Sequence, residues 1–121
     1  MTAPVWTVVF AVDAVADLAL IEAHLTEAYR GFGESPAEAR QHAEARIEAI
    51  ITSAERLAAA PFRGTARDDL LPGLRHLALD SAIYWFIPDS DRREIRVLAL
   101  FFGGQDHQRH MLVRLLQKGA G

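Results

Sequence analysis

The spacing of apolar residues changes once along the chain, and this change limits the folds that the sequence can adopt. From residue 13 to residue 60, apolar side chains recur every three or four positions, the period of a helix with one buried face. From residue 74 to residue 101, they form short β-branched and aromatic runs, which are typical of strands. We therefore expect helices followed by a sheet, in one domain that spans residues 1–121.

Two helices are expected in the first part. Gly33 and Ser35-Pro36 separate them, and a serine cap followed by proline is a favourable start for the second helix. We expect Asp13 to cap the first helix and Pro61 to end the second. The predicted buried stripes are Val15, Leu18, Ile21, Leu25, Ala28 and Phe32 in the first helix, and Ala39, Ala43, Ile47, Ile50, Ala54 and Leu57 in the second. Because the second stripe is rich in small residues, the helices can lie close together as an antiparallel hairpin.

Four strands are expected around these helices. Residues 5–10 form the first, and three more follow the turn-rich segment 61–73, at residues 74–79, 82–87 and 94–101. The run Ala82-Ile83-Tyr84-Trp85-Phe86-Ile87 shows no alternation, which predicts a central strand that is covered on both faces. Its three aromatic residues are interpreted as core, in preference to a platform for stacking nucleic acid bases.

A short helix is expected at the end of the chain. Gly103-Gly104 ends the last strand, and Asp106 can cap a helix from residue 107 to about residue 117. Its predicted apolar side is Met111, Leu112, Leu115 and Leu116. The fold class is therefore α+β with the order β-α-α-β-β-β-α: an N-terminal helical hairpin packed on a mainly antiparallel four-stranded sheet, followed by a short C-terminal helix.

Composition and charge exclude several classes of function. The chain has no cysteine, so it can form neither a disulfide nor a thiolate metal site. It shows neither a signal-peptide pattern nor an apolar run of about 18 residues, which predicts a cytoplasmic protein without a membrane span. Residues 1–60 carry four Arg and nine acids, whereas residues 61–121 carry nine bases and seven acids. An acidic first half disfavours non-specific binding to nucleic acid and favours a protein partner.

Short motifs near the end of the chain give no firm metal or acid–base site. His107 and His110 lie three residues apart and would share a helical face, but two histidines are only half of a zinc site. We interpret both as polar residues on the exposed side of the last helix and predict no metal and no cofactor. Gly103-Gly104 and Asp106 are interpreted as a turn and a cap, and Asp68-Asp69 as a solvated loop.

Four fragments, in this order and spacing, resemble toxins of the ParE/RelE family, which belong to type II toxin–antitoxin systems. They are Ala16-Asp17-Leu18 in the first helix, residues 57–61 with Gly64, Pro72-Gly73-Leu74-Arg75 at a strand opening, and Ile95-Arg96-Val97-Leu98 in the last strand. The resemblance extends over nearly the whole chain. It implies the RelE/ParE fold and a cytoplasmic bacterial plasmid-stabilisation toxin that a cognate antitoxin protein neutralises.

The family has two branches, and the resemblance leaves both open. ParE-like members bind DNA gyrase, whereas RelE-like members are nucleases that cut mRNA on the ribosome with a set of basic and acid–base side chains. The only lysine of this chain is Lys118, and the Pro72–Arg75 motif is closer to the ParE side. The resemblance therefore favours a gyrase inhibitor, with a ribosome-dependent endoribonuclease and a non-toxic binding module of the same fold as alternatives.

Candidate functional residues follow from the resemblance and from the pattern of apolar residues. Arg75, where the family places a strand arginine, and Arg67 are the catalytic candidates; alternatively, Arg75 pairs with Asp80 or a loop carboxylate. Several apolar residues lie outside the main stripes, and a small domain has few places to bury them. We predict that these bind the antitoxin: Leu20, Ile51 and Phe62, together with Val12.

Overall fold

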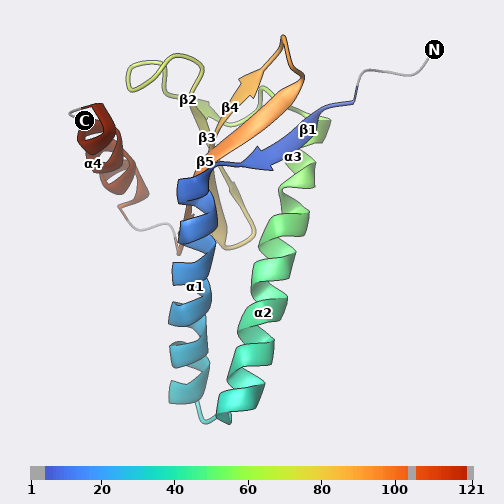
Figure 1. The fold of residues 1–121 in the computed structure, drawn as a ribbon, viewed down its shortest axis with the longest axis vertical. Coiled ribbons are helices and arrows are strands. Elements are labelled where there is room, and N and C mark those ends of the chain that lie inside the picture. Colours follow the sequence, from blue (N-terminus) through green and yellow to red (C-terminus); the bar gives the residue numbers. More distant parts are fainter. Residues whose placement is uncertain (1–4, 104–105, 120–121) are drawn as a thin grey trace.

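The computed structural model describes residues 5–103 and 106–119, and its helices and strands follow one another in nearly the predicted order (Figure 1). The order is β-α-α-α-β-β-β-β-α. The elements are β1 Thr7–Phe10, α1 Val12–Gly31, α2 Pro36–Ser53, α3 Glu55–Ala59, β2 Thr65–Ala66, β3 Arg75–Leu79, β4 Ala82–Asp89, β5 Glu94–Phe102 and α4 His107–Gly119. Within the described ranges, no helix combines the length and apolarity that crossing a membrane requires.

The helices α1 and α2 form the predicted antiparallel hairpin, and Figure 1 shows them side by side, reaching well beyond the sheet. Ser35 caps α2 as expected, because its Oγ accepts the Glu38 N–H at 3.2 Å. The predicted cap of α1 is wrong. Its N-cap is Ala11, and Asp13 lies inside the first turn, where its carboxylate instead forms an ion pair with α4.

The predicted stripe of α2 is confirmed, since all six of its residues are buried. The stripe of α1 is only partly right, because Val15 and Phe32 are exposed. Its buried face consists of Ala14, Asp17, Leu18, Ile21 and Leu25. This buried face includes the acid Asp17. Because the prediction counted apolar residues alone, it placed the stripe on a slightly different face of the helix.

The second helix ends earlier than predicted. It stops at Ser53 instead of continuing to Pro61, and α3 forms a separate short helix. The Ala54 N–H is shared between the carbonyls of Ile50 and Ile51, the bifurcated geometry of a helix end. Because the chain bends here, Leu57 reaches the core and is fully buried.

The sheet has the strand order β1-β5-β4-β3-β2. The predicted meander β3-β4-β5 is antiparallel, and β1 joins it parallel to β5. The sheet has five strands and not four, because Thr65 and Ala66 pair with His76 and Arg75. A two-residue strand is too short to show an alternating pattern, so the sequence could not reveal it.

The central strand β4 separates two apolar cores, as its lack of alternation predicts. Tyr84 and Phe86 face the hairpin, whereas Trp85 faces α4, and all three side chains are fully buried. The Tyr84 hydroxyl donates a hydrogen bond to the Ile50 carbonyl of α2, and burial raises the pKa of Tyr84 to about 12. The aromatic residues are therefore core, and α4 covers the sheet face opposite the hairpin.

Candidate functional site

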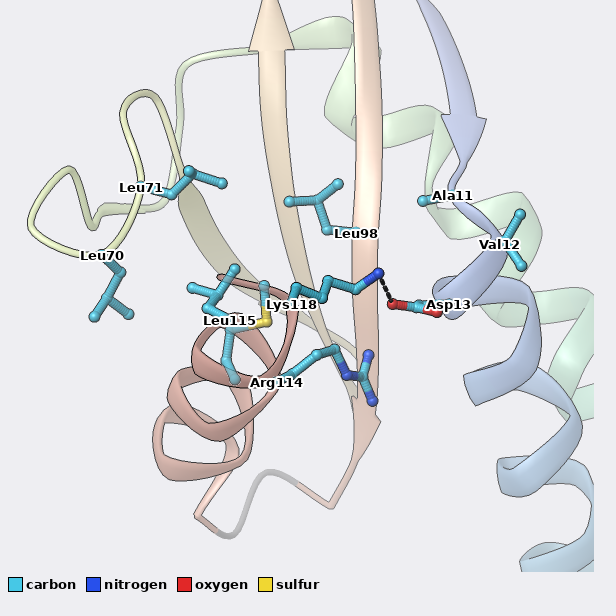
Figure 2. A pocket seen from close by; sticks show the side chains of 10 residues that line it. Ala11, Val12, Asp13, Leu70, Leu71, Leu98, Arg114, Leu115 and Lys118 are labelled. Atoms are coloured by element: carbon cyan, nitrogen blue, oxygen red, sulfur yellow. Dashed lines mark ion pairs between the residues drawn. The ribbon is translucent and has the colours of Figure 1, made fainter. Parts of the chain in front are cut away.

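A pocket of ≈ 460 Å³ lies between the start of α1 and α4, and Figure 2 shows it from close by. Its apolar walls come from the loop before β3, from β5 and from α4: Leu70, Leu71, Leu98, Met111 and Leu115. Asp13, Arg114 and Lys118 supply charged groups on the side nearest α1. Such a pocket can bind an apolar group of a ligand or partner, which the charged side chains would orient through a few polar contacts.

Two ion pairs join α4 to α1 beside this pocket. The Lys118 Nζ lies 2.7 Å from the Asp13 Oδ2, and this contact, drawn as a dashed line in Figure 2, lowers the pKa of Asp13. One turn later in α1 and one turn earlier in α4, the Arg114 Nη1 and Nη2 donate to the Asp17 carboxylate at 2.8 Å. Asp17 hydrogen bonding raises the pKa of Arg114.

Asp17 is the buried member of these pairs, with 5% of its surface exposed. Its Oδ2 also accepts the Leu100 N–H at 2.9 Å, so one carboxylate connects α1, β5 and α4. A buried carboxylate needs such partners because desolvation disfavours its charge. Asp17 was predicted only as part of a motif, although an acid on the buried face of a helix is a signal that could have identified it.

Two histidines that the sequence analysis did not connect meet on the α4 side of the sheet. His76 in β3 lies opposite Trp85 in the strand register, and the two ring centroids are 4.5 Å apart. His107, the first residue of α4, has its ring centroid 5.0 Å from that of His76. We call His76 and His107 the imidazole pair.

The surroundings of the pair favour neutral imidazoles. The Trp85 indole N–H donates to the His107 Nδ1 at 3.1 Å; because an indole only donates, this nitrogen carries no proton. Burial lowers the pKa of both imidazoles, and Arg67 lowers both further; His107 also lowers the pKa of His76. A neutral imidazole beside an arginine can accept a proton from a reacting group.

Arg67, one of the predicted catalytic candidates, lies next to the imidazole pair. Its guanidinium binds both carboxylate oxygens of Asp69 at 2.9 Å and donates to the Gln108 Oε1 at 2.7 Å. The neighbouring Asp68 accepts the Gly73 N–H at 2.9 Å. The Asp68-Asp69 segment is thus an organised loop that fixes Arg67, and not merely a solvated one.

Arg75, the other candidate, has a different environment from the predicted one. Its guanidinium donates to the Arg63 carbonyl at 3.0 Å and to the Gly64 carbonyl at 3.4 Å, and Asp80 instead contacts Ser53 and Arg56. Gly64 is needed here, since it has φ +92° and a Cβ would lie 2.5 Å from the His76 carbonyl oxygen. The predicted pairing with Asp80 is therefore wrong.

The residues predicted to bind an antitoxin are all exposed, but they lie on different elements. Leu20 on α1 lies in grooves beside Arg114, Phe62 makes an edge-to-face contact with Trp6, and Ile51 lies near the end of α2. Val12 lines the pocket at the start of α1. Their role in antitoxin binding stays a prediction. A partner that contacts all four residues must extend over several elements of the surface.

His107 and His110 share a helix but not an environment. His107 is half-buried against Trp85, contrary to the prediction of an exposed side chain, whereas His110 is exposed and stacks on Phe101. Among the described residues, no group of three or more His, Asp or Glu side chains is placed to hold a metal ion. Gly104, part of the predicted turn, lies outside the described residues.

The fold of this chain is similar to that of known proteins. Neither the protein-family models nor the curated proteins include a match to this chain. Among solved structures, a chain of the "Chromosomal ParDE TA system from P. aeruginosa" is 20% identical, with a TM-score of 0.60, over 81% of this chain and 96% of that chain. A chain of the toxin–antitoxin complex RelBE2 from Mycobacterium tuberculosis is 16% identical, with a TM-score of 0.55, over 84% and 94%. The chain therefore has the RelE/ParE-like fold that its motifs implied.

Proposed function

We propose that this chain is the toxin component of a type II toxin–antitoxin system and that a cognate antitoxin protein neutralises it. The observation that carries the proposal is the likeness in fold to chains of the ParDE and RelBE2 systems, which covers almost their whole length. Two independent features agree with a protein partner: exposed apolar side chains on the hairpin and an apolar pocket beside it.

The antitoxin segment binds Leu20, Ile51 and Phe62 in this proposal. These side chains retain 69%, 42% and 53% exposure, so a partner can bury additional apolar surface at each. Antitoxin tails that order on binding can follow a surface across several elements, as this distribution requires. Because the first 60 residues are acidic, the partner should carry Arg or Lys beside its apolar anchors, and association should slow as salt increases.

Binding can be tested with a pull-down of the protein encoded by the adjacent gene. Leu20→Asp and Ile51→Asp place a charge within the proposed interface and should each weaken binding at least tenfold. Gln41→Asp adds the same charge at an exposed position of α2 outside the proposed contacts and serves as the matched control. Wild-type affinity in both folded interface variants would show that the antitoxin binds elsewhere.

The proposed target is DNA gyrase, which the toxin inhibits by binding. The Pro72–Arg75 motif supports this choice, as does the engagement of Lys118, the only lysine, in an ion pair with Asp13. Arg75 is the residue of the strand opening that we expect to contribute to toxicity. It is anchored through two backbone carbonyls, so its guanidinium is pre-oriented without a carboxylate neutralising it there.

One observation favours the second candidate, an mRNA endoribonuclease. The imidazole pair next to Arg67 combines groups that can accept and donate a proton with a cation that can bind a phosphate. A non-toxic binding module of the same fold is the third candidate. Induction of the gene separates them: a DNA-damage response supports gyrase, rapid translation arrest with cut mRNA supports the nuclease, and unimpaired growth with soluble protein supports the third.

A further inference from the structure

We propose that the hydrogen bond between Trp85 and His107 is a proton-sensitive latch, which releases the first turn of α4 from the sheet when the imidazole pair is protonated. This property goes beyond the proposed toxin activity and concerns the start of α4. It rests on three features of the structure. The Trp85 indole can only donate a hydrogen bond, the His76 Nε2 is buried and has no partner among the described residues, and two ion pairs attach α4 to α1 far from the imidazole pair.

The first feature is the hydrogen bond itself. The His107 Nδ1 must accept from the Trp85 indole, so a proton added to this nitrogen places two donors 3.1 Å apart. The Trp85 side chain is fully buried and cannot turn to water for another acceptor without leaving its core. Protonation at this nitrogen is therefore incompatible with the docked position of His107.

The second feature is His76. Its Nε2 is buried and, among the described residues, has no hydrogen-bond partner. Its ring packs against both Trp85 and His107, so a proton on this imidazole brings a positive charge into contact with two rings. Both members of the imidazole pair thus resist a proton while α4 remains docked.

The surrounding charges act in the same direction. From the loop before β3, the Arg67 cation lowers the pKa of both imidazoles, and the Asp69 carboxylate is occupied by bidentate binding to Arg67. On α4 itself, Asp106, Arg109 and His110 are exposed, so water screens them. The pair also lies at the positive end of the α4 dipole, which disfavours a further positive charge.

The third feature holds the rest of α4 in place. The Arg114–Asp17 and Lys118–Asp13 ion pairs lie two and three turns beyond the latch. The hydrogen bond from Lys118 lowers the pKa of Asp13 and thereby favours the charged form of this carboxylate. Release is therefore confined to the first turn, and the sheet and the hairpin keep their structure.

The sign of the pH dependence follows from the direction of these shifts. Because the folded state binds protons less readily than the unfolded state at both imidazoles, their contribution to stability is complete above the ordinary histidine pKa of about 6.5. It is lost as the pH falls through the lower pKa of the docked state. The latch is consequently closed at neutral pH and opens in acid.

The latch can be tested by NMR on the full chain between pH 7.5 and pH 5.0. The indole proton of Trp85 should shift upfield as it loses its acceptor, and the first-turn amides of α4 should lose at least tenfold in exchange protection. Trp6, the only other tryptophan, gives an internal reference, and the amides of β4 and β5 should remain protected. His107→Asn keeps an acceptor near the Nδ1 position but cannot be protonated, so its α4 should stay docked at pH 5.0.

His110→Asn is the matched control, because His110 lies one turn further along α4 and stacks on Phe101 instead of Trp85. In this variant, the first-turn amides of α4 should lose exchange protection at pH 5.0 as they do in the wild type. The latch is overturned if wild-type α4 stays protected at pH 5.0, if His107→Asn opens like the wild type, or if the β4 and β5 amides lose protection together with α4. Should His107→Asn not fold, the imidazole C–H resonances of the wild type decide: pKa values below 6.5 support the latch, and values at or above 6.5 contradict it.

Discussion

The two faces of the sheet are stabilised in different ways. On the hairpin face, one continuous core of sixteen buried apolar residues joins α1, α2, α3 and the sheet. On the α4 face, the buried cluster of the described residues is small and consists of Leu74, Trp85, Ala99 and Met111. The helix is additionally held by two ion pairs and by hydrogen bonds to His107 and Gln108. Apolar packing therefore dominates the first face, whereas polar contacts over long sequence distances position the second.

The largest effect is expected on the hairpin face. Phe86→Ala removes a fully buried ring from the large core and should lower the free energy of unfolding by about 4 kcal/mol. Urea denaturation followed by circular dichroism measures this loss. A decrease below about 1 kcal/mol would contradict the view that this face carries most of the stability.

The second largest effect is expected at the buried ion pair between Asp17 and Arg114. Asp17→Asn leaves the Arg114 guanidinium without its charged partner and weakens the contact to the Leu100 N–H, which should cost about 3 kcal/mol in the free energy of unfolding. Asp13→Asn, one turn earlier on the same helix, is the matched control. Its partner Lys118 is largely exposed, so this loss should stay near 0.5 kcal/mol. Equal losses of unfolding free energy in the two variants would contradict the view that the buried ion pair contributes more stability than the exposed one.

On the α4 face, Met111→Ala should have a smaller and more local effect. It removes a buried side chain from the small core and should cost about 2 kcal/mol. Hydrogen exchange should show faster opening of α4, while the amides of α1 and α2 keep their protection. Uniform loss of protection across the chain would mean that the two faces unfold as a single unit.

A smaller effect on stability than that of Met111→Ala, but a clear one on toxicity, is expected for Arg75→Ala. It removes two hydrogen bonds to backbone carbonyls and should cost about 1 kcal/mol in the free energy of unfolding. Growth after induction should be inhibited less than by the wild type, while antitoxin binding persists. Arg92→Ala, at an exposed turn position, is the control; unchanged killing by a soluble Arg75→Ala protein would leave Arg75 a purely structural residue.

The same difference between the faces explains what the sequence could predict. The hairpin and the meander follow from local periodicity, and the stripe from Ala39 to Leu57 is buried as expected. The prediction of the apolar side of α4 was less accurate, because Met111 is buried but Leu112 and Leu116 are exposed. The small core under α4 needs only a narrow apolar strip, so periodicity alone overestimates the buried face.

The candidate site was harder to predict because its residues come together only through the strand register. His76 meets His107 because β3 pairs with β4 and α4 crosses that face, although 30 positions separate the two in the sequence. Asp17 and Arg114 are still further apart along the chain. Arg67 and Arg75 were identified as candidates, but their partners, a loop carboxylate and two backbone carbonyls, depend on the geometry of the segment before β3.

The proposed neutralisation of this toxin by its own antitoxin can be tested by inducing the gene alone and together with the directly adjacent gene. Growth should stop within a few generations when the wild-type chain is expressed alone, and it should be restored when both proteins are expressed and co-purify. Undisturbed growth despite abundant, soluble and folded protein would contradict the account. So would growth arrest that no neighbouring gene product relieves.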